Sequence, residues 1–134
     1  MNKEDNIKEK FKQALISTVK VISEEYQIDN EFKKNLSSEN YNFFELDNLN
    51  NRSDFIKLRA ETDSEALKRK FSNQVIYLKN VPKNSSCKKL YDISEKIRYE
   101  LLGSKMLRGI FANFNENYNY KINLKRKDQL KSKE

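Results

Sequence analysis

The stretch that decides the fold reads R-A-E-T-D-S-E-A-L-K-R-K-F-S-N-Q-V-I-Y-L-K-N-V-P at residues 59–82. It continues as S-S-C-K-K-L-Y-D-I-S-E-K-I-R-Y-E-L-L-G-S-K-M-L-R-G-I-F-A-N-F at residues 85–114. Apolar residues recur at intervals of three and four through both parts, which predicts three consecutive amphipathic helices. Val81-Pro82 and Gly103 divide them, because proline disfavours helical geometry in the preceding residue and glycine favours the left-handed position after a helix. The pattern defines a fold class and no chemistry.

The first helix of this stretch is expected to begin at Ser53 and carries two apolar stripes. More than a third of a turn separates the two stripes around the helix axis. A straight helix would therefore contact two partners, whereas the alternative is a bend near Thr62, which Glu65 follows at capping-box spacing. The stripes are Phe55, Leu58, Thr62 and Ala66, and then Leu67, Phe71, Val75 and Leu78.

Two further helices follow Pro82, and each has one apolar stripe that we expect to face the core. Ser85 or Ser86 begins the first of them and Gly103 ends it. Ser104 can cap the second, because a short side-chain oxygen accepts hydrogen bonds from the free amides of the first turn. The stripes consist of Leu90, Ile93, Ile97 and Leu101 in the first helix and Leu107, Ile110, Phe111 and Phe114 in the second.

A fourth helix is predicted near the N-terminus, where apolar residues recur from Ile7 to Tyr26 by way of Phe11, Leu15, Val19 and Ile22. Residues 27–52 lack a helical period, and Ile28–Phe32 and Tyr41–Leu46 could pair as a two-stranded ribbon. The expected fold class is therefore all-α. We predict a small four-helix domain with a short β-ribbon between the first two helices.

Helical periodicity weakens after Asn115, in the stretch N-E-N-Y-N-Y. We therefore expect the helical domain to cover residues 1–120 and residues 121–134 to form a disordered basic tail or linker. These last fourteen residues contain six Lys or Arg and two acids, which gives 6 − 2 = +4 of the total charge of +7. A solvated linker and a contact with nucleic acid or an anionic surface are both compatible with this charge. In the second case Tyr118 and Tyr120 could stack on bases.

The composition indicates one small globular unit and leaves out the residues of several common sites. A chain of 134 residues that is 37% hydrophobic supports one modest core. It has no histidine and a single cysteine, so the usual ligands of zinc are missing. Its two glycines form no phosphate-binding G-x-x-x-x-G-K-[ST] loop. We expect no catalytic residues, no metal site and no cofactor in this chain.

Three features favour a cytoplasmic location. Cys87 has no second cysteine with which to form an internal disulfide, which is typical of a reducing compartment. The N-terminal sequence M-N-K-E-D-N is too polar for a signal peptide. No apolar run approaches the roughly 18 residues that a membrane-spanning helix needs.

Six charged residues on two of the predicted helices form the candidate site. Each helix mixes acids and bases, so interhelical ion pairs could hold the helices in register or form part of a partner interface. The alternative is two solvated helix faces, whose exposed pairs each contribute less than about 1 kcal/mol. The group consists of Arg59, Glu61, Asp63, Glu95, Arg98 and Glu100.

The same stretch resembles the N-terminal domain of the CobT subunit of the aerobic, ATP-dependent cobaltochelatase. That family carries R-G-x-A-D-S-x-A-L, H-D-x-x-x-H, a proline, E-Q-A-R-x-E-x-x-G and M-x-G-V-x-x-N in this order. The resemblance covers most of residues 7–114, and Phe11–Ile22 is similar to the family's first helix. The matching residues are Arg59, Asp63, Ser64, Ala66, Leu67, Pro82, Asp92, Glu95, Arg98, Glu100, Gly103, Gly109, Ala112 and Asn113.

The sequence departs from the family pattern chiefly at H-D-x-x-x-H. The two histidines fall on Ser72 and Tyr77 and the acid falls on Asn73, so the roles of those family residues do not carry over. Ala60 stands at the first family glycine and Leu107 at the methionine. The D-x-S-x-S motif of the family's von Willebrand-type domain is also missing. We therefore expect these residues to correspond to the N-terminal part of the family alone.

The resemblance implies a role in cobalamin biosynthesis, in the ATP-driven insertion of Co²⁺ into hydrogenobyrinic acid a,c-diamide. In the family an AAA+ subunit hydrolyses ATP, a large subunit binds the tetrapyrrole, and the CobT subunit couples them. This chain would then be part of a non-catalytic subunit of a ligase. ATP, Mg²⁺ and Co²⁺ would bind to other domains or subunits, and the two other subunits are the expected partners.

One alternative function is a small basic nucleic-acid-binding helical protein. The sequence pI of 9.4 and the lysine-rich last residues favour it. Nucleic acid is the less favoured partner, and no membrane contact is expected.

Overall fold

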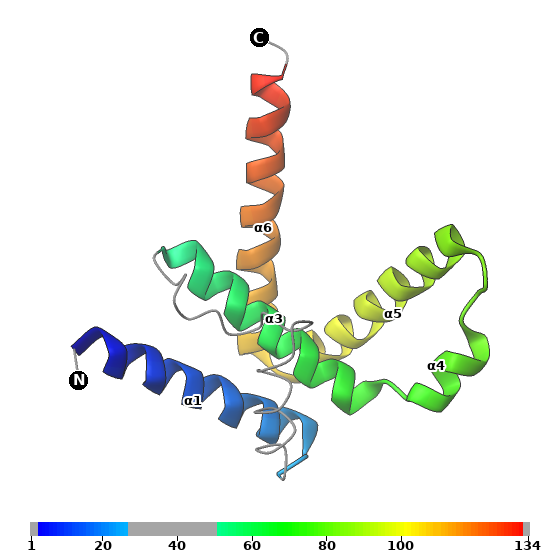
Figure 1. The fold of residues 1–134 in the computed structure, drawn as a ribbon, viewed down its shortest axis with the longest axis horizontal. Helices are drawn as coiled ribbons and strands as arrows, with labels where there is room; N and C mark the ends of the chain where they lie inside the picture. Colours follow the sequence, from blue (N-terminus) through cyan, green and yellow to red (C-terminus); the bar gives the residue numbers. More distant parts are fainter. Residues whose placement is uncertain (1–2, 27–50, 133–134) are drawn as a thin grey trace.

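The computed structural model describes residues 3–26 and 51–132, and these residues form five helices (Figure 1). The prediction of an all-α fold is confirmed. The predicted β-ribbon between residues 28 and 46 lies outside the described residues; no strand occurs within the described ones, and the ribbon is not confirmed. The helices are α1 (Lys3–Ser23), α3 (Arg52–Phe71), α4 (Gln74–Asn80), α5 (Ser85–Met106) and α6 (Arg108–Lys131).

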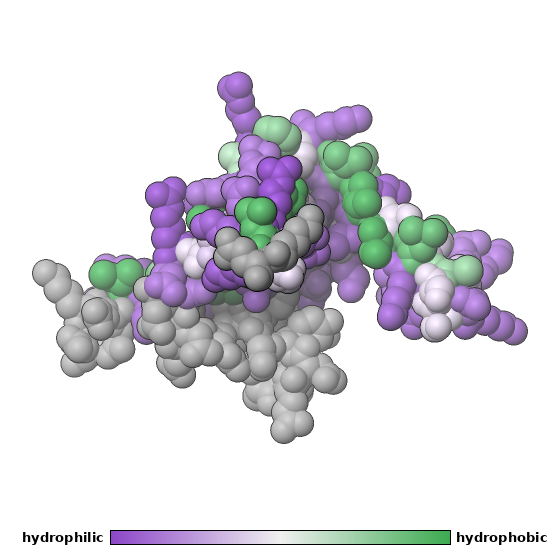
Figure 2. Space-filling model, turned by 90° about the horizontal axis from the view of Figure 1, so that it is seen from above, coloured by the Kyte–Doolittle hydropathy of each residue, from purple (hydrophilic) through white to green (hydrophobic). Residues whose placement is uncertain are grey.

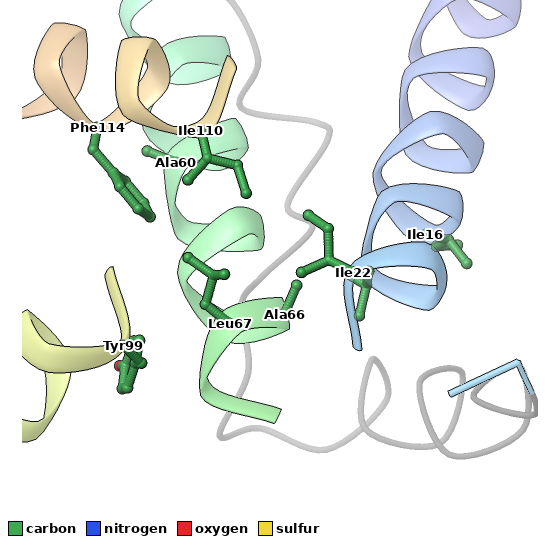
Figure 3. Close-up of a cluster of buried hydrophobic side chains, with 9 residues drawn as sticks. Ile16, Ile22, Ala60, Ala66, Leu67, Tyr99, Ile110 and Phe114 are labelled. Carbon is green, nitrogen blue, oxygen red and sulfur yellow. The ribbon is translucent and has the colours of Figure 1, made fainter. Parts of the chain in front are cut away.

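Helix α3 is the central element, and α1, α5 and α6 all pack against it. Its two stripes do contact different partners, as a straight helix requires. In the first stripe, Ala66 faces Ile22 of α1 (Figure 3), whereas Leu67 of the second stripe lies against Gly103 of α5. The largest cluster of buried hydrophobic residues joins all four helices and consists of Ile16, Val19, Ile22, Ala60, Ala66, Leu67, Tyr99, Ile110 and Phe114.

The helix does not restart at Thr62, as its capping-box spacing had allowed, because α3 runs unbroken from Arg52 to Phe71. The Thr62 side chain is fully buried, and its hydroxyl donates to the Leu58 carbonyl oxygen at 2.8 Å. This bond satisfies the hydroxyl within the helix, so a polar residue can occupy the core face. The helix begins one residue before the predicted Ser53, with the Asn51 amide donating to the Asp54 carboxylate at 3.1 Å.

The helix that we predicted to continue to Pro82 is divided at Ser72. Asn73 adopts an extended conformation there, and its side-chain oxygen accepts from the amides of Val75 and Ile76 at 3.0 and 3.1 Å. The asparagine therefore caps a separate short helix, α4. Val75 and Leu78 of the predicted stripe are exposed on α4, so their assignment to the core is wrong.

Gly103 does not end a helix, because α5 continues through it to Met106. A Cβ atom at Gly103 would lie 2.3 Å from both methyl carbons of Leu67, whose side chain is fully buried. Glycine is thus needed for the close approach of α5 to α3. The chain turns instead at Leu107, which has an extended backbone, and the predicted cap at Ser104 is wrong.

The apolar stripe of α5 does not face the core. Only the C-terminal half of α5 is buried, through Tyr99, Glu100 and Gly103. The rest of the helix projects from the centre of the molecule towards α4, as Figure 1 shows. The predicted inward residues are therefore exposed, with 66% of Leu90, 56% of Ile93, 51% of Ile97 and 56% of Leu101 accessible.

The two terminal helices match their predicted stripes in part. In α1, Leu15, Val19 and Ile22 are buried as predicted, whereas Ile7 is exposed; Tyr26 lies beyond the end of α1 and is exposed as well. In α6, Ile110 and Phe114 are buried, whereas Leu107 and Phe111 are exposed. Helix α6 extends to Lys131, so the predicted loss of helix after Tyr120 is wrong.

Replacement of Gly103 by alanine should destabilise the fold, because the new methyl group would overlap the Leu67 side chain. We expect the free energy of unfolding to fall by about 1–3 kcal/mol. Urea unfolding followed by circular dichroism measures this change. Gly109→Ala is the matched control, since a Cβ at Gly109 meets nothing within 4 Å. The control should leave stability unchanged or raise it by up to about 1 kcal/mol, and equal losses in the two variants would contradict the role of the close approach.

Candidate functional site

Glu100 is the centre of a buried polar cluster between α3, α5 and α6. The residue is 7% exposed, and its carboxylate accepts from the hydroxyl groups of Ser64 and Tyr118, each at 2.6 Å. The Lys96 ammonium lies 3.7 Å from the same carboxylate, one helical turn before it. Burying a carboxylate is costly unless donors compensate it. The three helices supply those donors, so the cluster fixes their relative positions.

Asp63 makes a second polar link, from α3 to α6. It is 3% exposed, and its carboxylate accepts from the Asn113 side-chain amide at 2.6 Å. Burial raises the pKa of Asp63 above its usual value, although the Asn113 hydrogen bond and the positive charge of Arg59 oppose this shift. A carboxylate held mainly by a neutral amide is less well compensated than one in an ion pair.

Glu95 and Arg98 of α5 secure the end of α3. Their side chains form an ion pair at 2.6 Å. The Ser72 hydroxyl donates to Glu95 at 2.9 Å, and Arg98 donates to the carbonyl oxygen of Phe71 at 2.7 Å. The Arg98 hydrogen bond lowers the pKa of Glu95, with a smaller contribution in the same direction from Ser72. The pair therefore supplies partners for backbone and side-chain groups at the point where α3 stops.

The structure brings together only some of the six predicted site residues. Asp63 and Glu100 are buried at the helix junction, and Glu95 and Arg98 pair with each other. Arg59 is exposed and Glu61 is half-buried. Within the described residues no ion pair joins the α3 set to the α5 set. Hydrogen bonds from uncharged side chains connect the helices instead, through Ser64, Ser72, Asn113 and Tyr118.

The three positions at which the sequence departs from H-D-x-x-x-H line one groove of about 600 Å³ between α3, α4 and α5. Ser72 and Asn73 lie at the end of α3, and Tyr77 is on α4. The Tyr77 hydroxyl donates to Asp92 of α5 at 2.5 Å, and this hydrogen bond is the main cause that raises the pKa of Tyr77. The groove wall is therefore already bridged by hydrogen bonds between its own residues.

The groove carries charges of both signs. Its lining includes the bases Lys68, Lys88 and Lys96 and the acids Glu65 and Asp92. Within the described residues, no group of three or more Cys, Asp or Glu side chains is placed to hold a metal ion. The groove can offer hydrogen bonds and charge to a polar ligand. At the two family histidine positions, Ser72 and Tyr77 each donate a hydrogen bond to a carboxylate of α5.

Tyr118, which could stack on bases in the nucleic-acid alternative, donates its hydroxyl hydrogen bond to Glu100. Burial and this hydrogen bond raise its pKa. Its ring also lies 6.0 Å from the Lys121 ammonium. The role in the polar cluster could not be inferred from periodicity, because Tyr118 is 40% exposed and belongs to no apolar stripe.

Removal of the Tyr118 hydroxyl should weaken the junction, because a buried carboxylate would lose one of its donors. We expect Tyr118→Phe to lower the free energy of unfolding by about 1–2 kcal/mol. Tyr120→Phe is the matched control, since Tyr120 has nearly the same exposure, 41% against 40%. Chemical denaturation of both variants measures the difference. A loss in the control as large as that in Tyr118→Phe would count against the hydrogen bond.

Asp63→Asn should change the pH dependence of stability. Because the folded-state pKa of Asp63 is raised above its usual value of 3.8, the unfolded chain ionises first as the pH rises. The wild type therefore loses stability between 3.8 and the folded-state pKa, whereas asparagine cannot ionise and can still accept from Asn113. The free energy of unfolding of the variant minus that of wild type should be larger at about pH 7 than at about pH 3.5. A difference that stays constant or falls with pH would contradict the shift.

The residues that carry the family resemblance meet in space. Asp63 bonds Asn113, Ser64 bonds Glu100, and Leu67 packs on Gly103, so residues of all three helical segments pair across the junction. Residues that match at separate points of the sequence thus form one connected structure. The resemblance is consequently more than a likeness of isolated helices.

Among the comparisons with known proteins, one found a match, to a family model. A search of curated proteins and a search of solved structures each found no match. Among the described residues, no helix combines the length and the apolar character needed to cross a bilayer. The family model described as "Cobalamin biosynthesis protein CobT" matches residues 5–134. The chain belongs to the CobT family.

Proposed function

We propose that this chain is a subunit-interaction domain of a cobaltochelatase and couples an AAA+ ATPase subunit to cobalt insertion. Membership of the CobT family places the chain in cobalamin biosynthesis as a chelatase subunit. The finer steps are part of the proposal: ATP hydrolysis drives insertion of Co²⁺ into hydrogenobyrinic acid a,c-diamide, and a large subunit holds the tetrapyrrole. The proposed site of action is the cytoplasm.

The observation that carries the proposal is that residues matching the family pattern bond to one another in the helix junction. Asp63, Ser64, Glu100 and Asn113 bond to one another inside the helix junction rather than around a cleft. Hydrogen bonds of this kind hold the helices in fixed relative positions. Helices held in fixed positions can present a defined surface to a partner protein. The proposal therefore assigns ATP, Mg²⁺ and Co²⁺ to other domains or subunits, and gives this chain the task of presenting surfaces to its partners.

Reconstitution tests the coupling role. The chain would be combined with the ATPase subunit and the tetrapyrrole-binding subunit of the same chelatase, and cobalt insertion would be followed by the change in tetrapyrrole absorbance. We expect the chain to bind the ATPase subunit in a pull-down with purified proteins. We also expect cobalt insertion to be faster with the chain than without it, because the chain would couple ATP hydrolysis to insertion. No binding to either subunit, with the circular dichroism spectrum of a folded helical protein, would overturn the proposal.

Reversal of the charge of Arg59 tests the partner face of α3. Arg59 is exposed, but its charge also favours the buried Asp63 carboxylate, so Arg59→Glu should lower the melting temperature slightly and leave the helical circular dichroism spectrum unchanged. We expect it to weaken binding of the ATPase subunit about tenfold, as loss of a charged interface contact can. Lys57→Glu is the matched control, because it makes the same charge change at an exposed position on the opposite side of α3. Equal weakening by both variants would show a general charge effect and contradict a specific interface at Arg59.

A further inference from the structure

The outer face of α5 carries an apolar stripe with no cover from the described residues. Leu90, Ile93, Ile97 and Leu101 follow one another at steps of three and four, and more than half of each side chain is exposed. Figure 2 shows hydrophobic residues gathered over α4 and α5, at the right of that view. Contiguous exposed apolar residues on a soluble domain mark interaction sites.

The shape of the stripe indicates a helix as its partner. At about 100° per residue the four side chains lie within an arc of about 80°, and along the axis they span about three turns. A stripe this narrow is typical of a coiled-coil seam, whereas a helix packed into a globular core or lying on a membrane shows a wider apolar face. The stripe therefore fits the seam of one additional helix.

The charges beside the stripe are positive. Lys89 lies four residues before Ile93, and Lys105 lies four residues after Leu101, so each sits at one edge of the stripe. Both lysines are exposed, and neither forms an ion pair with a described residue.

The acids of α5 do not balance these lysines, because all three already serve contacts inside the molecule. Asp92 bonds Tyr77, Glu95 bonds Ser72 and Arg98, and Glu100 is buried beneath Ser64 and Tyr118. The edges of the stripe therefore present positive charge alone.

We infer that the outer face of α5 binds an acidic amphipathic helix of another protein. The partner helix would place apolar residues on the Leu90–Leu101 stripe and acids opposite Lys89 and Lys105, as the flanking positions of paired helices do. A second copy of this chain is the poorer partner, because it would bring further cations, and no free acid, to the same edges. The inference names a surface other than that of Arg59 and does not depend on the chelatase role.

Peptide binding tests the inference without any knowledge of the natural partner. The probe is a fluorescent synthetic helix of about four turns, with leucine at the seam positions and glutamate at the flanking positions. A second peptide carries lysine in place of glutamate. We expect saturable binding of the acidic peptide that weakens as salt rises, and at least about tenfold weaker binding of the basic peptide.

Variants connect that binding to α5. Leu90→Gln should weaken binding of the acidic peptide about tenfold, whereas Leu130→Gln should leave it unchanged. Leu130 is the matched control for Leu90, because the two leucines are 68% and 66% exposed. Lys89→Glu with Lys105→Glu should reverse the preference, so that the basic peptide binds more tightly. Both lysines are exposed, and the circular dichroism spectrum should be unchanged.

Three outcomes would overturn the inference. Equal binding of the two peptides, or no binding of the acidic one, would remove the role of charge. A dimer in sedimentation experiments that Leu90→Gln dissociates would assign the stripe to a second copy of the chain. Binding to vesicles of anionic phospholipid that Leu90→Gln abolishes, without peptide binding, would assign it to a membrane surface.

Discussion

The structure depends on one close approach, that of α5 to α3 at Gly103 and Leu67. Because Gly103 has no side chain, the two backbones come near enough for Glu100 to accept from Ser64 of α3. The same geometry brings α6 within reach, so that Tyr118 bonds Glu100 and Asn113 bonds Asp63. Ion pairs from α3 to the residues after α1 add a further tie, through Lys70 with Glu24 and Arg69 with Glu25.

This junction explains why α5 has an uncovered side. The helix contacts α3 and α6 through its C-terminal half, and all three of its acids are turned to partners within the molecule. Its apolar stripe is left on the outside, together with Lys89 and Lys105, which form no ion pair with a described residue. The polar contacts that fix the fold therefore also determine the chemistry of the surface.

Local pattern predicted where α1, α3, α5 and α6 lie, but it missed the separate helix α4, several helix ends and much of the packing. The apolar period of α1 and the two stripes of α3 predicted buried Val19 and Ala66, because those helices have a partner on each apolar side. Ile97 has the same period but is exposed. Periodicity shows which side of a helix is apolar, but it does not show whether another element covers that side. Gly103 was assigned to a helix end because glycine is common there. Its actual role could not be seen in the local pattern, since Leu67, which it contacts, is 36 residues away in sequence. Asn73 begins α4 within a stretch that reads as continuous helix, and its capping bonds were not anticipated.

Some members of the polar contacts at the helix junction were among the six predicted site residues, but their connections were not anticipated. Asp63, Glu95, Arg98 and Glu100 were chosen as charged residues on two helices, and ion pairs between those helices were expected. The partners on other helices are neutral and include Asn113 and Tyr118 of a third helix, whereas the ion pairs of Glu95 and Glu100 lie within α5. No spacing rule connects residues that are 18 or 50 positions apart, so only the packed structure reveals these pairs.

A double-mutant cycle between Ser64 and Glu100 tests the central claim most directly, because it isolates their interaction from the rest of the junction. The unfolding free energies of Ser64→Ala, Glu100→Gln and the double variant would be compared with wild type. If the cluster joins α3 to α5, the two changes should be coupled by about 1–3 kcal/mol. Effects that add to within about 0.5 kcal/mol would contradict the account.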